Sequence, residues 1–250
     1  MNNHHNCLFE RIRRRLKQQP EYRHIPAVWG NLYRGLSLAR AFLRYKLGTI
    51  SADGTILDVG SGGSDNTRFM SIGANAKILA ADIRPLDGVT IVCDLEKEIP
   101  LEQESVDVLL LLNVLEHIYN YENLIAECCR VLKPGGVMYL YVPYLYQRHI
   151  ARYADFTVDD YFRFSPGAIK KLLTGIGRCT EIVEVDTCGY GPFTAASNYI
   201  ATVVNAGWFK VVIHMIGFIF DKIYYLVKGN APDRVSIYEW PIAVWVKAVK

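Results

Sequence analysis

The stretch Ile56-Leu57-Asp58-Val59-Gly60-Ser61-Gly62-Gly63 decides the fold of this chain. Apolar residues with one embedded acid run directly into a glycine-rich turn, a pattern that is typical of a strand ending beside a ligand. A helix predicted over residues 65–72 would direct its N-terminus at that ligand and favour anionic groups. Asp58 precedes the first glycine, where a carboxylate repels a pyrophosphate. Its position therefore favours a ligand that carries an ammonium group.

The composition indicates a full hydrophobic core and an uneven distribution of charge. The 250 residues are 51% hydrophobic, which is enough for one α/β domain with additions. Residues 1–50 hold ten Lys and Arg residues against two acids, so we predict a basic helical extension there and one domain over residues 51–250. The six cysteines form no C-x-x-C pair, which predicts reduced thiols, no metal site and a cytoplasmic protein. The polar N-terminus predicts no secretory signal.

Predicted strands and helices alternate along the rest of the chain. The predicted strands cover residues 55–59, 76–82, 89–93, 106–112, 137–142, 180–185 and 237–246. The predicted helices cover residues 8–17, 32–46, 65–72, 121–132 and 166–174, with further helix inside 199–227. Several strands are continuous apolar runs, which indicates burial on both faces. The pattern predicts a Rossmann-like, doubly wound, mostly parallel seven-stranded sheet with helices on both faces, plus N-terminal helices and an apolar C-terminal helical insertion.

The acid that ends the second strand narrows the choice of ligand. Asp82 lies 22 residues after Gly60, where a carboxylate can accept both ribose hydroxyls of either NAD or S-adenosylmethionine. The NAD pattern G-x-G-x-x-G requires a glycine at position 65, and this chain has Asp65. The only Tyr-x-x-x-Lys, Tyr224 to Lys228, lies in an apolar segment where a chance match is the better account. The residues therefore disfavour a dinucleotide.

Four segments follow one another in a familiar order: ILDVGSGGS, AADIR, VCDLEKEIPLEQESVDVLLLLNVLEHI and RVLKPGGVMYLYVP. Over residues 53–145 they resemble class I S-adenosylmethionine-dependent methyltransferases, most closely the type 11 group that acts on small molecules. The resemblance implies a methyltransferase with S-adenosylmethionine as its cofactor. One departure concerns the third motif glycine, whose place Ser64 takes. A serine there can cap the helix predicted next.

The resemblance also assigns cofactor contacts to residues at the strand ends. Asp82 would bind the ribose hydroxyls, Asp94 with the backbone of Leu95 would hold the adenine edge, and Asn113 would line the methionine end. The full predicted set for the cofactor is Asp58, Gly60, Ser61, Gly62, Asp82, Ile83, Asp94, Leu95 and Asn113.

A second resemblance covers residues 149–173, HIARYADFTVDDYFRFSPGAIKKLL. The stretch is similar to the DYFRFTP segment of methyltransferases associated with polysaccharide or cell-surface glycan pathways, where a loop after the fifth strand packs over the active site. This implies a substrate lid over residues 144–165 and a saccharide or glycolipid acceptor. The alternative is ordinary packing, with Tyr161, Phe162 and Phe164 in the core and Ser165 capping a helix that begins at Pro166.

Methyl transfer to oxygen benefits from a general base near neutral pH, which directs attention to histidines. His117 follows the fourth strand, and His149 lies in the predicted lid. Both are candidate catalytic bases. The alternatives are a histidine that fixes its own loop for His117 and a solvated loop residue for His149. Two other functions stay open: N- or C-methylation of a metabolite or lipid-like quinone, and a non-catalytic module that binds the cofactor.

Two segments bear on partners and location. Residues 8–17 place three apolar side chains beside a basic face, which suits anionic lipid or a solvated cover helix. In a helix over 199–227, Lys210, His214, Asp221 and Lys228 share one stripe, and the rest is almost entirely apolar. The strongly apolar run 211–220 is shorter than the ~20 residues that span a bilayer. Peripheral contact with the inner face of the membrane, a homodimer interface and a hydrophobic acceptor pocket stay open. No nucleic acid is expected, because no binding motif accompanies the basic residues.

Overall fold

The computed structural model describes residues 25–148, 151–152, 157–176, 181–204, 206–228 and 239–250. The chain divides into two compact units: unit 1 comprises Met1–Phe42 and Gly189–Ile242, and unit 2 comprises Leu43–Cys188 and Ala243–Lys250. This division differs from the boundary predicted after residue 50, because residues 189–242 share a unit with the N-terminal residues. The predicted helix over residues 8–17 lies outside the described residues.

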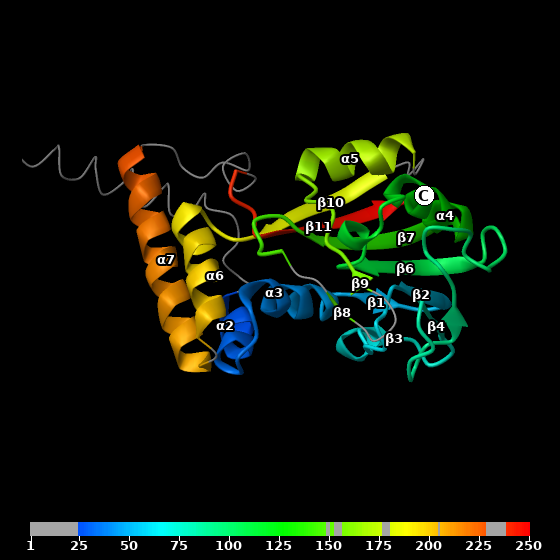
Figure 1. Cartoon of the computed structure of the whole chain (residues 1–250), viewed down its shortest axis with the longest axis horizontal. Helices are drawn as coiled ribbons and strands as arrows, with labels where there is room; N and C mark the ends of the chain where they lie inside the picture. Colours follow the sequence, from blue (N-terminus) through cyan, green and yellow to red (C-terminus); the bar gives the residue numbers. More distant parts are fainter. Residues whose placement is uncertain (1–24, 149–150, 153–156, 177–180, 205, 229–238) are drawn as a thin grey trace, which may run out of the picture. The chain divides into compact units, whose positions relative to one another are not determined.

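Unit 2 is built on a seven-stranded sheet with the order β10-β11-β7-β6-β2-β4-β5. Five adjacent strands run parallel to one another: β7, β6, β2, β4 and β5. Strand β11 runs antiparallel to both of its neighbours, β7 and β10 (Figure 1). The strands are β2 Thr55–Val59, β4 Lys77–Asp82, β5 Ile91–Val92, β6 Val106–Leu112, β7 Leu132–Pro143, β10 Glu181–Cys188 and β11 Ala243–Val249. The predicted mostly parallel α/β sheet of seven strands is confirmed.

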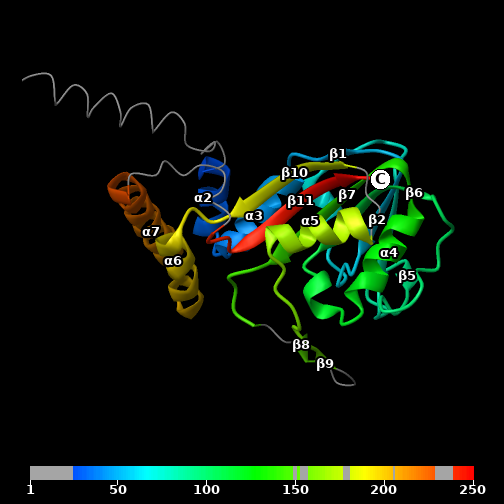
Figure 2. The same ribbon diagram turned by 90° about the horizontal axis from the view of Figure 1, so that it is seen from above.

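Smaller elements complete unit 2. Helices α4 (Tyr121–Val131) and α5 (Pro166–Gly175) lie next to each other and cover the sheet through β7 and β10 (Figure 2). Their apolar faces meet strands whose residues are fully buried, such as Leu109 and Leu111 of β6. The Ser165 hydroxyl accepts a hydrogen bond from the Ala168 N–H at 3.2 Å, so the predicted serine cap of α5 is confirmed. Two short pairs, β1 (Ser51–Ala52) with β3 (Ser71–Ile72) and β8 (Ala151–Arg152) with β9 (Thr157–Val158), stand apart from the sheet.

The helix predicted over residues 65–72 is wrong. The segment contains only a 3₁₀ turn, η2 (Thr67–Phe69), followed by β3. Asp65 Oδ1 accepts hydrogen bonds from Thr67 Oγ1 at 2.7 Å and from the Arg68 N–H at 3.1 Å. These bonds accompany a single 3₁₀ turn, after which Met70 is extended and Ser71 pairs with β1. The ligand site therefore has no helix N-terminus after the glycines, and the anion argument does not apply.

The helix predicted over residues 32–46 is two helices, α2 (Ile25–Tyr33) and α3 (Leu38–Leu47). Gly35 adopts φ 89° between them, a conformation that glycine tolerates best. The Ser37 hydroxyl then accepts a hydrogen bond from the Arg40 N–H at 3.3 Å and begins α3. The last strand also lies later than predicted, at β11, and residues 237–238 of the prediction are outside the described part.

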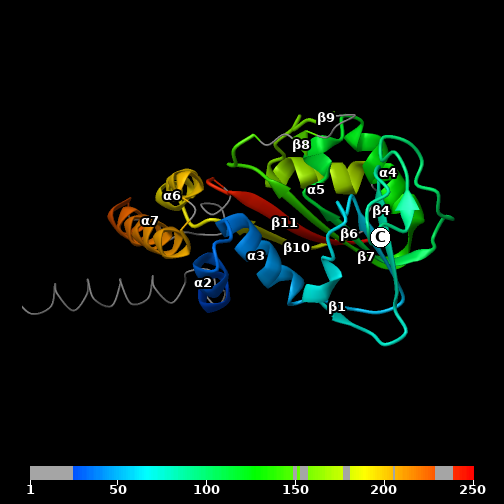
Figure 3. The same cartoon turned by 60° about the horizontal axis from the view of Figure 1, so that its bottom comes forward.

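In unit 1, helix α7 (Gly207–Lys228) packs against both α6 (Pro192–Val203) and α2 (Figure 3). The helical region predicted over residues 199–227 is thus parts of two helices. Val204 adopts extended backbone after α6 and separates them. None of the helices in the described ranges is long and apolar enough to cross a membrane.

Candidate active site

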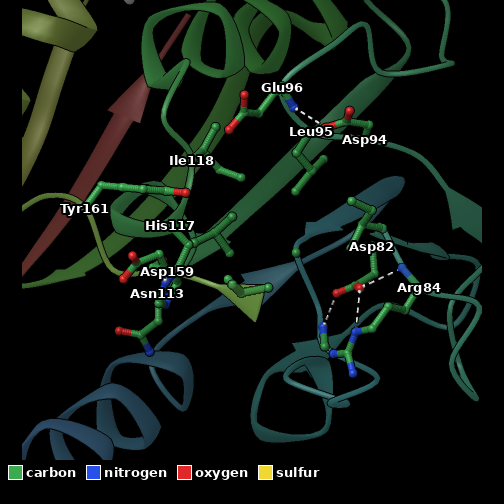
Figure 4. Close-up of a pocket in the computed structure, with 15 residues that line it drawn as sticks. Asp82, Arg84, Asp94, Leu95, Glu96, Asn113, His117, Ile118, Asp159 and Tyr161 are labelled. Carbon is green, nitrogen blue, oxygen red and sulfur yellow. Dashed lines mark hydrogen bonds and ion pairs between the residues drawn. The ribbon is translucent and has the colours of Figure 1, made fainter. Parts of the chain in front are cut away.

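A cavity of about 440 Å³ lies where β2, β4 and β6 end at the same edge of the sheet. This is the size range of small-molecule sites, and the edge lies at the switch in strand order where open α/β sheets bind ligands. Fifteen residues line it (Figure 4): Gly60, Gly62, Asp82, Ile83, Arg84, Asp94, Leu95, Glu96, Asn113, Val114, His117, Ile118, Val158, Asp159 and Tyr161. All predicted site residues except three are among them. Asp58 and Ser61 lie outside the lining set, and His149 lies outside the described residues.

The glycine loop after β2 needs glycine for two different reasons. Gly60 adopts φ 68°, and a Cβ there would overlap the side chain of Val114. Gly62 adopts φ 60°, and a Cβ there would meet nothing within 4 Å, so its backbone faces open space in the cavity. The N–H groups of Gly60 and Ser61 donate to the Ala81 carbonyl at 2.8 and 3.2 Å, which ties the loop to β4. The loop thus presents bare backbone to a ligand.

Asp82, at the end of β4, holds this loop in place. Its Oδ2 accepts a hydrogen bond from the Gly62 N–H at 2.8 Å, and its Oδ1 accepts one from the Arg84 N–H at 3.0 Å. The Arg84 Nε lies 3.5 Å from Oδ1. The side chain lines the cavity although the residue is only 7% exposed. Arg84 was not predicted, because an arginine two residues after a strand carries no signal of its own in the sequence.

Asp58 is a buried carboxyl behind the lining residues. Its Oδ2 accepts a hydrogen bond from Asn66 Nδ2 at 3.0 Å, and its Oδ1 has no hydrogen-bond partner in the described part of the chain. Burial raises the pKa of Asp58 to about 7; the hydrogen bond from Asn66 opposes that rise, and the nearby charges of Asp65 and Asp82 add to it. A cationic group bound near this carboxyl would favour its ionised form.

Asp94 stays an ionised acceptor at the cavity wall. Its Oδ1 accepts a hydrogen bond from the Glu96 N–H at 3.0 Å, and Lys97 Nζ lies 3.1 Å from Oδ2. These contacts, the backbone bond foremost, lower the pKa of Asp94 against the opposing effect of burial. Leu95 beside it is buried and offers an apolar surface. Across the described ranges, no group of three or more His, Cys, Asp or Glu residues lies close enough to hold a metal ion.

Asn113 and His117 form the other side of the cavity in the view of Figure 4, across from Asp82. Asn113 adopts φ 54°, which asparagine tolerates better than most residues, and its N–H donates to the Tyr141 carbonyl at 2.8 Å. His117 Nδ1 lies 2.6 Å from the Asp159 carbonyl oxygen. Because a carbonyl only accepts, Nδ1 carries the proton, and in the neutral ring Nε2 carries the lone pair.

Glu116 is a buried acid next to the cavity-lining His117 that sequence reasoning also missed. Its side chain is fully buried, its Oε1 lies 3.8 Å from His117 Nε2, and within the described chain neither carboxyl oxygen has a hydrogen-bond partner. Burial raises the pKa of Glu116 to about 8; the charge of Asp160 adds to the rise, and the residue's own backbone N–H and the charge of Arg163 oppose it. A lone glutamate beside a histidine gives no sign in the sequence that the fold encloses it.

The described residues of the segment 149–173 divide between the cavity wall and the core, and the lid role stays a prediction. Val158, Asp159 and Tyr161 line the cavity. Phe164 is buried in the core, as the packing alternative predicted, and its ring centroid lies 5.2 Å from that of Tyr121. Tyr161 is 49% exposed, so the alternative that placed it in the core is wrong for this residue.

Comparisons with known proteins agree with this geometry. Residues 57–140 match the family model described as a methyltransferase domain. A relative from Mycolicibacterium smegmatis, named as an S-adenosylmethionine-dependent methyltransferase, is 44% identical over 46 residues, and this match spans only 18% of the length of each chain. A chain in the complex between the Haloferax volcanii Trm112 methyltransferase activator and a methyltransferase superposes with a TM-score of 0.51 at 15% identity, covering 85% of this chain and 88% of that one. Haemonchus contortus phosphoethanolamine N-methyltransferase 2 gives a TM-score of 0.48 at 16% identity, covering 84% and 51%.

The match over residues 57–140 identifies a methyltransferase domain within unit 2, and the strand order, the glycine loop and the acids at the strand ends agree with the class I S-adenosylmethionine-dependent type. S-adenosylmethionine is its cofactor. The residues present fit that group, because Gly62 offers open backbone, Asp58 has an unsatisfied buried oxygen, and the strand-end acids supply acceptors. The predicted fold, class and cofactor are confirmed.

Proposed function

We propose that this chain transfers the methyl group of S-adenosylmethionine to an oxygen atom of a small acceptor, most simply a saccharide or glycolipid. The observation that carries the proposal is His117 at the cavity wall, with Nδ1 held by the Asp159 carbonyl at 2.6 Å. When bound, the cofactor supplies an activated methyl group. The protein must then position the acceptor, exclude water and accept the acceptor's proton.

His117 is the candidate general base. With Nδ1–H donated to Asp159, the ring keeps a fixed orientation, and Nε2 is the nitrogen that can accept a proton from a hydroxyl. Glu116 Oε1 lies 3.8 Å from that nitrogen. Because burial raises the pKa of Glu116 to about 8, this carboxyl keeps its proton at neutral pH and does not act as a counter-ion of the ring. His117 is thus oriented through Nδ1, and Nε2 is the candidate proton acceptor.

In this proposal each strand-end residue binds a different part of the cofactor. Asp82 would accept the ribose hydroxyls, Asp94 with Leu95 would hold the adenine edge, and Asn113 would line the methionine end. The buried Asp58 would balance the charge of the ammonium group. The proposal is supported by the position of Asp82, Asp94 and Asn113 at the ends or next turns of neighbouring strands around one cavity.

The side of the cavity formed by segment 149–173 suits a sugar. Tyr161 lines the cavity and packs edge-on against Tyr119, with ring centroids 5.6 Å apart. Both rings are largely exposed, at 49% and 68%. An aromatic ring with a polar tip matches a sugar, which has apolar C–H faces and hydroxyl edges. The similarity of this segment to methyltransferases of glycan pathways supports the same acceptor class and the lid role.

Labelled S-adenosylmethionine, incubated with the protein and fractionated extracts of its source cell, would identify the acceptor and the methylated atom. For an oxygen acceptor, His117→Ala should lower kcat by about 10²–10⁴-fold while cofactor affinity is retained; the same substitution at His149 tests the second candidate base. A product methylated at nitrogen or carbon would refute the oxygen assignment. Cofactor binding without any labelled product would favour a non-catalytic module instead.

A further inference from the structure

Helices α6 and α7 of unit 1 bury their polar side and expose their apolar side. The polar stripe of α7 is turned inward: Lys210, His214 and Asp221 are 9%, 3% and 2% exposed. Helices on the surface of water-exposed proteins normally direct such a stripe outward and bury the apolar face. The orientation of this stripe could not be read from the sequence.

Each residue of the inward stripe forms hydrogen bonds with a neighbouring segment of unit 1. Lys210 Nζ donates to the Gly35 carbonyl at 2.6 Å, and His214 Nδ1 lies 2.8 Å from the Ser197 hydroxyl. Asp221 accepts hydrogen bonds from the N–H groups of Phe193 and Thr194 at 2.9 and 2.8 Å, and so caps the beginning of α6. These contacts fix the rotation of α7 about its axis and explain why Lys210, His214 and Asp221 do not face outward. Lys222 is half-buried, with its Nζ over the Phe218 ring.

The outward face is consequently apolar. Over the described side chains of α6 and α7, Thr202 is the only exposed residue that is neither apolar nor aromatic, and no charged side chain is exposed. On α7 the exposed large apolar side chains, 40–82% accessible, are Trp208, Val212, Met215, Ile216, Ile219, Phe220, Ile223 and Val227. Tyr199, Ile200 and Val203 continue the face on α6. A contiguous apolar surface without charges usually marks a contact site.

Charge indicates the chemistry of the partner. Unit 1 contains 12 Lys and Arg residues against five Asp and Glu, a net charge of +7, whereas unit 2 contains 16 against 20, a net charge of −4. The unit that carries the apolar face is therefore the one that an anionic surface attracts, by about 1 kcal/mol for each Lys or Arg close to the lipid. A second copy of unit 1 would instead meet a like charge.

We propose that the outward face of α6 and α7 binds the surface of an anionic lipid bilayer, with the helices lying in the interface. Neither helix needs to span the bilayer, because the apolar side chains sit on one side of each helix and the polar stripe on the other. Trp208 at the beginning of α7 adds a residue type that favours the boundary between headgroups and acyl chains. This proposal is independent of the acceptor and of the general base.

The test is co-sedimentation of the full chain with vesicles that mix phosphatidylglycerol and phosphatidylcholine, and with vesicles of phosphatidylcholine alone. We expect binding to the anionic vesicles at low salt, weaker binding at high salt and little binding to the neutral vesicles. Ile219→Asp should weaken binding at least about tenfold, because it removes an aliphatic side chain that the bilayer would bury and adds a charge. Val183→Asp is the matched control, since Val183 on β10 is equally exposed at 48% and belongs to unit 2.

Cofactor affinity and circular dichroism establish whether both variants are folded. If Ile219→Asp does not fold, Ile223→Ser provides a second test on the same face. The proposal is overturned if the wild-type chain stays in the supernatant with anionic vesicles at low salt. It is equally overturned if both aspartate variants lose binding alike. Sedimentation velocity tests the remaining alternative, a dimer of this chain. If the chain is a dimer without lipid, Ile219→Asp dissociates it and no vesicles are bound, the face belongs to a contact with a second copy.

Discussion

Glu116 makes the stability of unit 2 depend on pH in a direction opposite to that of an ordinary surface carboxyl. In the folded protein its pKa is about 8 instead of 4.5, because the side chain is fully buried. Between these two values the folded carboxyl keeps its proton while the unfolded one loses it. The folded state then binds more protons, so the free energy of unfolding falls as pH rises from about 4.5 to about 8. Replacing Glu116 with Gln removes this dependence.

The size of the effect follows from the difference between the folded and unfolded pKa of Glu116. A pKa difference of one corresponds to about 1.4 kcal/mol, so a rise from 4.5 to about 8 amounts to at most about 5 kcal/mol at pH 8 and nearly nothing at pH 4. The stability of Glu116→Gln relative to wild type should therefore rise by up to about 1.4 kcal/mol for each pH unit between 5 and 8. Asp58, which also titrates in this range, is present in both proteins and cancels.

Urea unfolding followed by circular dichroism at pH 5, 6, 7 and 8 measures this difference directly. The exposed Glu122 on α4 provides the control, because Glu122→Gln makes the same chemical change at a side chain that is not buried. Parallel curves for wild type and Glu116→Gln across the range would refute the reasoning. They would mean that Glu116 is ionised and solvated or paired in solution.

Three further outcomes are expected. Calorimetry should detect binding of S-adenosylmethionine and of its demethylated product, and no appreciable binding of NAD; tight NAD binding would contradict the interpretation of the glycine loop. Asp82→Ala should lower cofactor affinity at least about tenfold, because it removes acceptors for the ribose and releases the Gly62 N–H. Asp82→Asn should lose less affinity. Unchanged affinity in the Ala variant would exclude Asp82 from the site. Cofactor affinity should rise with pH through about 7, because a bound ammonium group favours the ionised form of Asp58, so that binding releases the proton of this carboxyl. In titrations from pH 6 to 8, Asp58→Asn should flatten this dependence.

Strand positions could be predicted well where burial on both faces leaves a continuous apolar run. β2 and β6 begin and end at the predicted residues, because glycines or polar residues bound each run. The start of α5 could be predicted for a local reason, the cap by Ser165 before Pro166. The place of the cavity at the strand ends followed from the same pattern, since parallel strands bring their C-terminal ends to one edge, whereas Asp94, Leu95 and Asn113 were assigned by the family resemblance.

The features that the sequence did not predict share a cause, because each depends on contacts with another segment of the chain. Residues 65–72 have helical composition, but the side chain of Asp65 bonds to nearby groups and Ser71 pairs with β1. The burial of Glu116 results from the chain of residues 159–162 folding back over it, with Tyr161 N–H on its carbonyl at 2.8 Å. The inward rotation of α7 depends on contacts to α6 such as that of Asp221 with Thr194. No periodicity in one segment reports on a partner in another.

The ladder between β10 and β11 has a consequence for how this protein is assembled from parts. Cys188 lies opposite Ala243 in that ladder, so residues 189–242 leave the sheet and return to it at one point. Topologically they are a hairpin loop of 54 residues, and a loop with adjoining ends can be lengthened, shortened or exchanged at a small entropic cost without altering the strand order. A two-residue turn joining Cys188 to Ala243 would retain every strand of the sheet. The sequence of the sheet and the sequence of the apolar helices can thus diverge separately, because the strand order does not depend on what the loop contains.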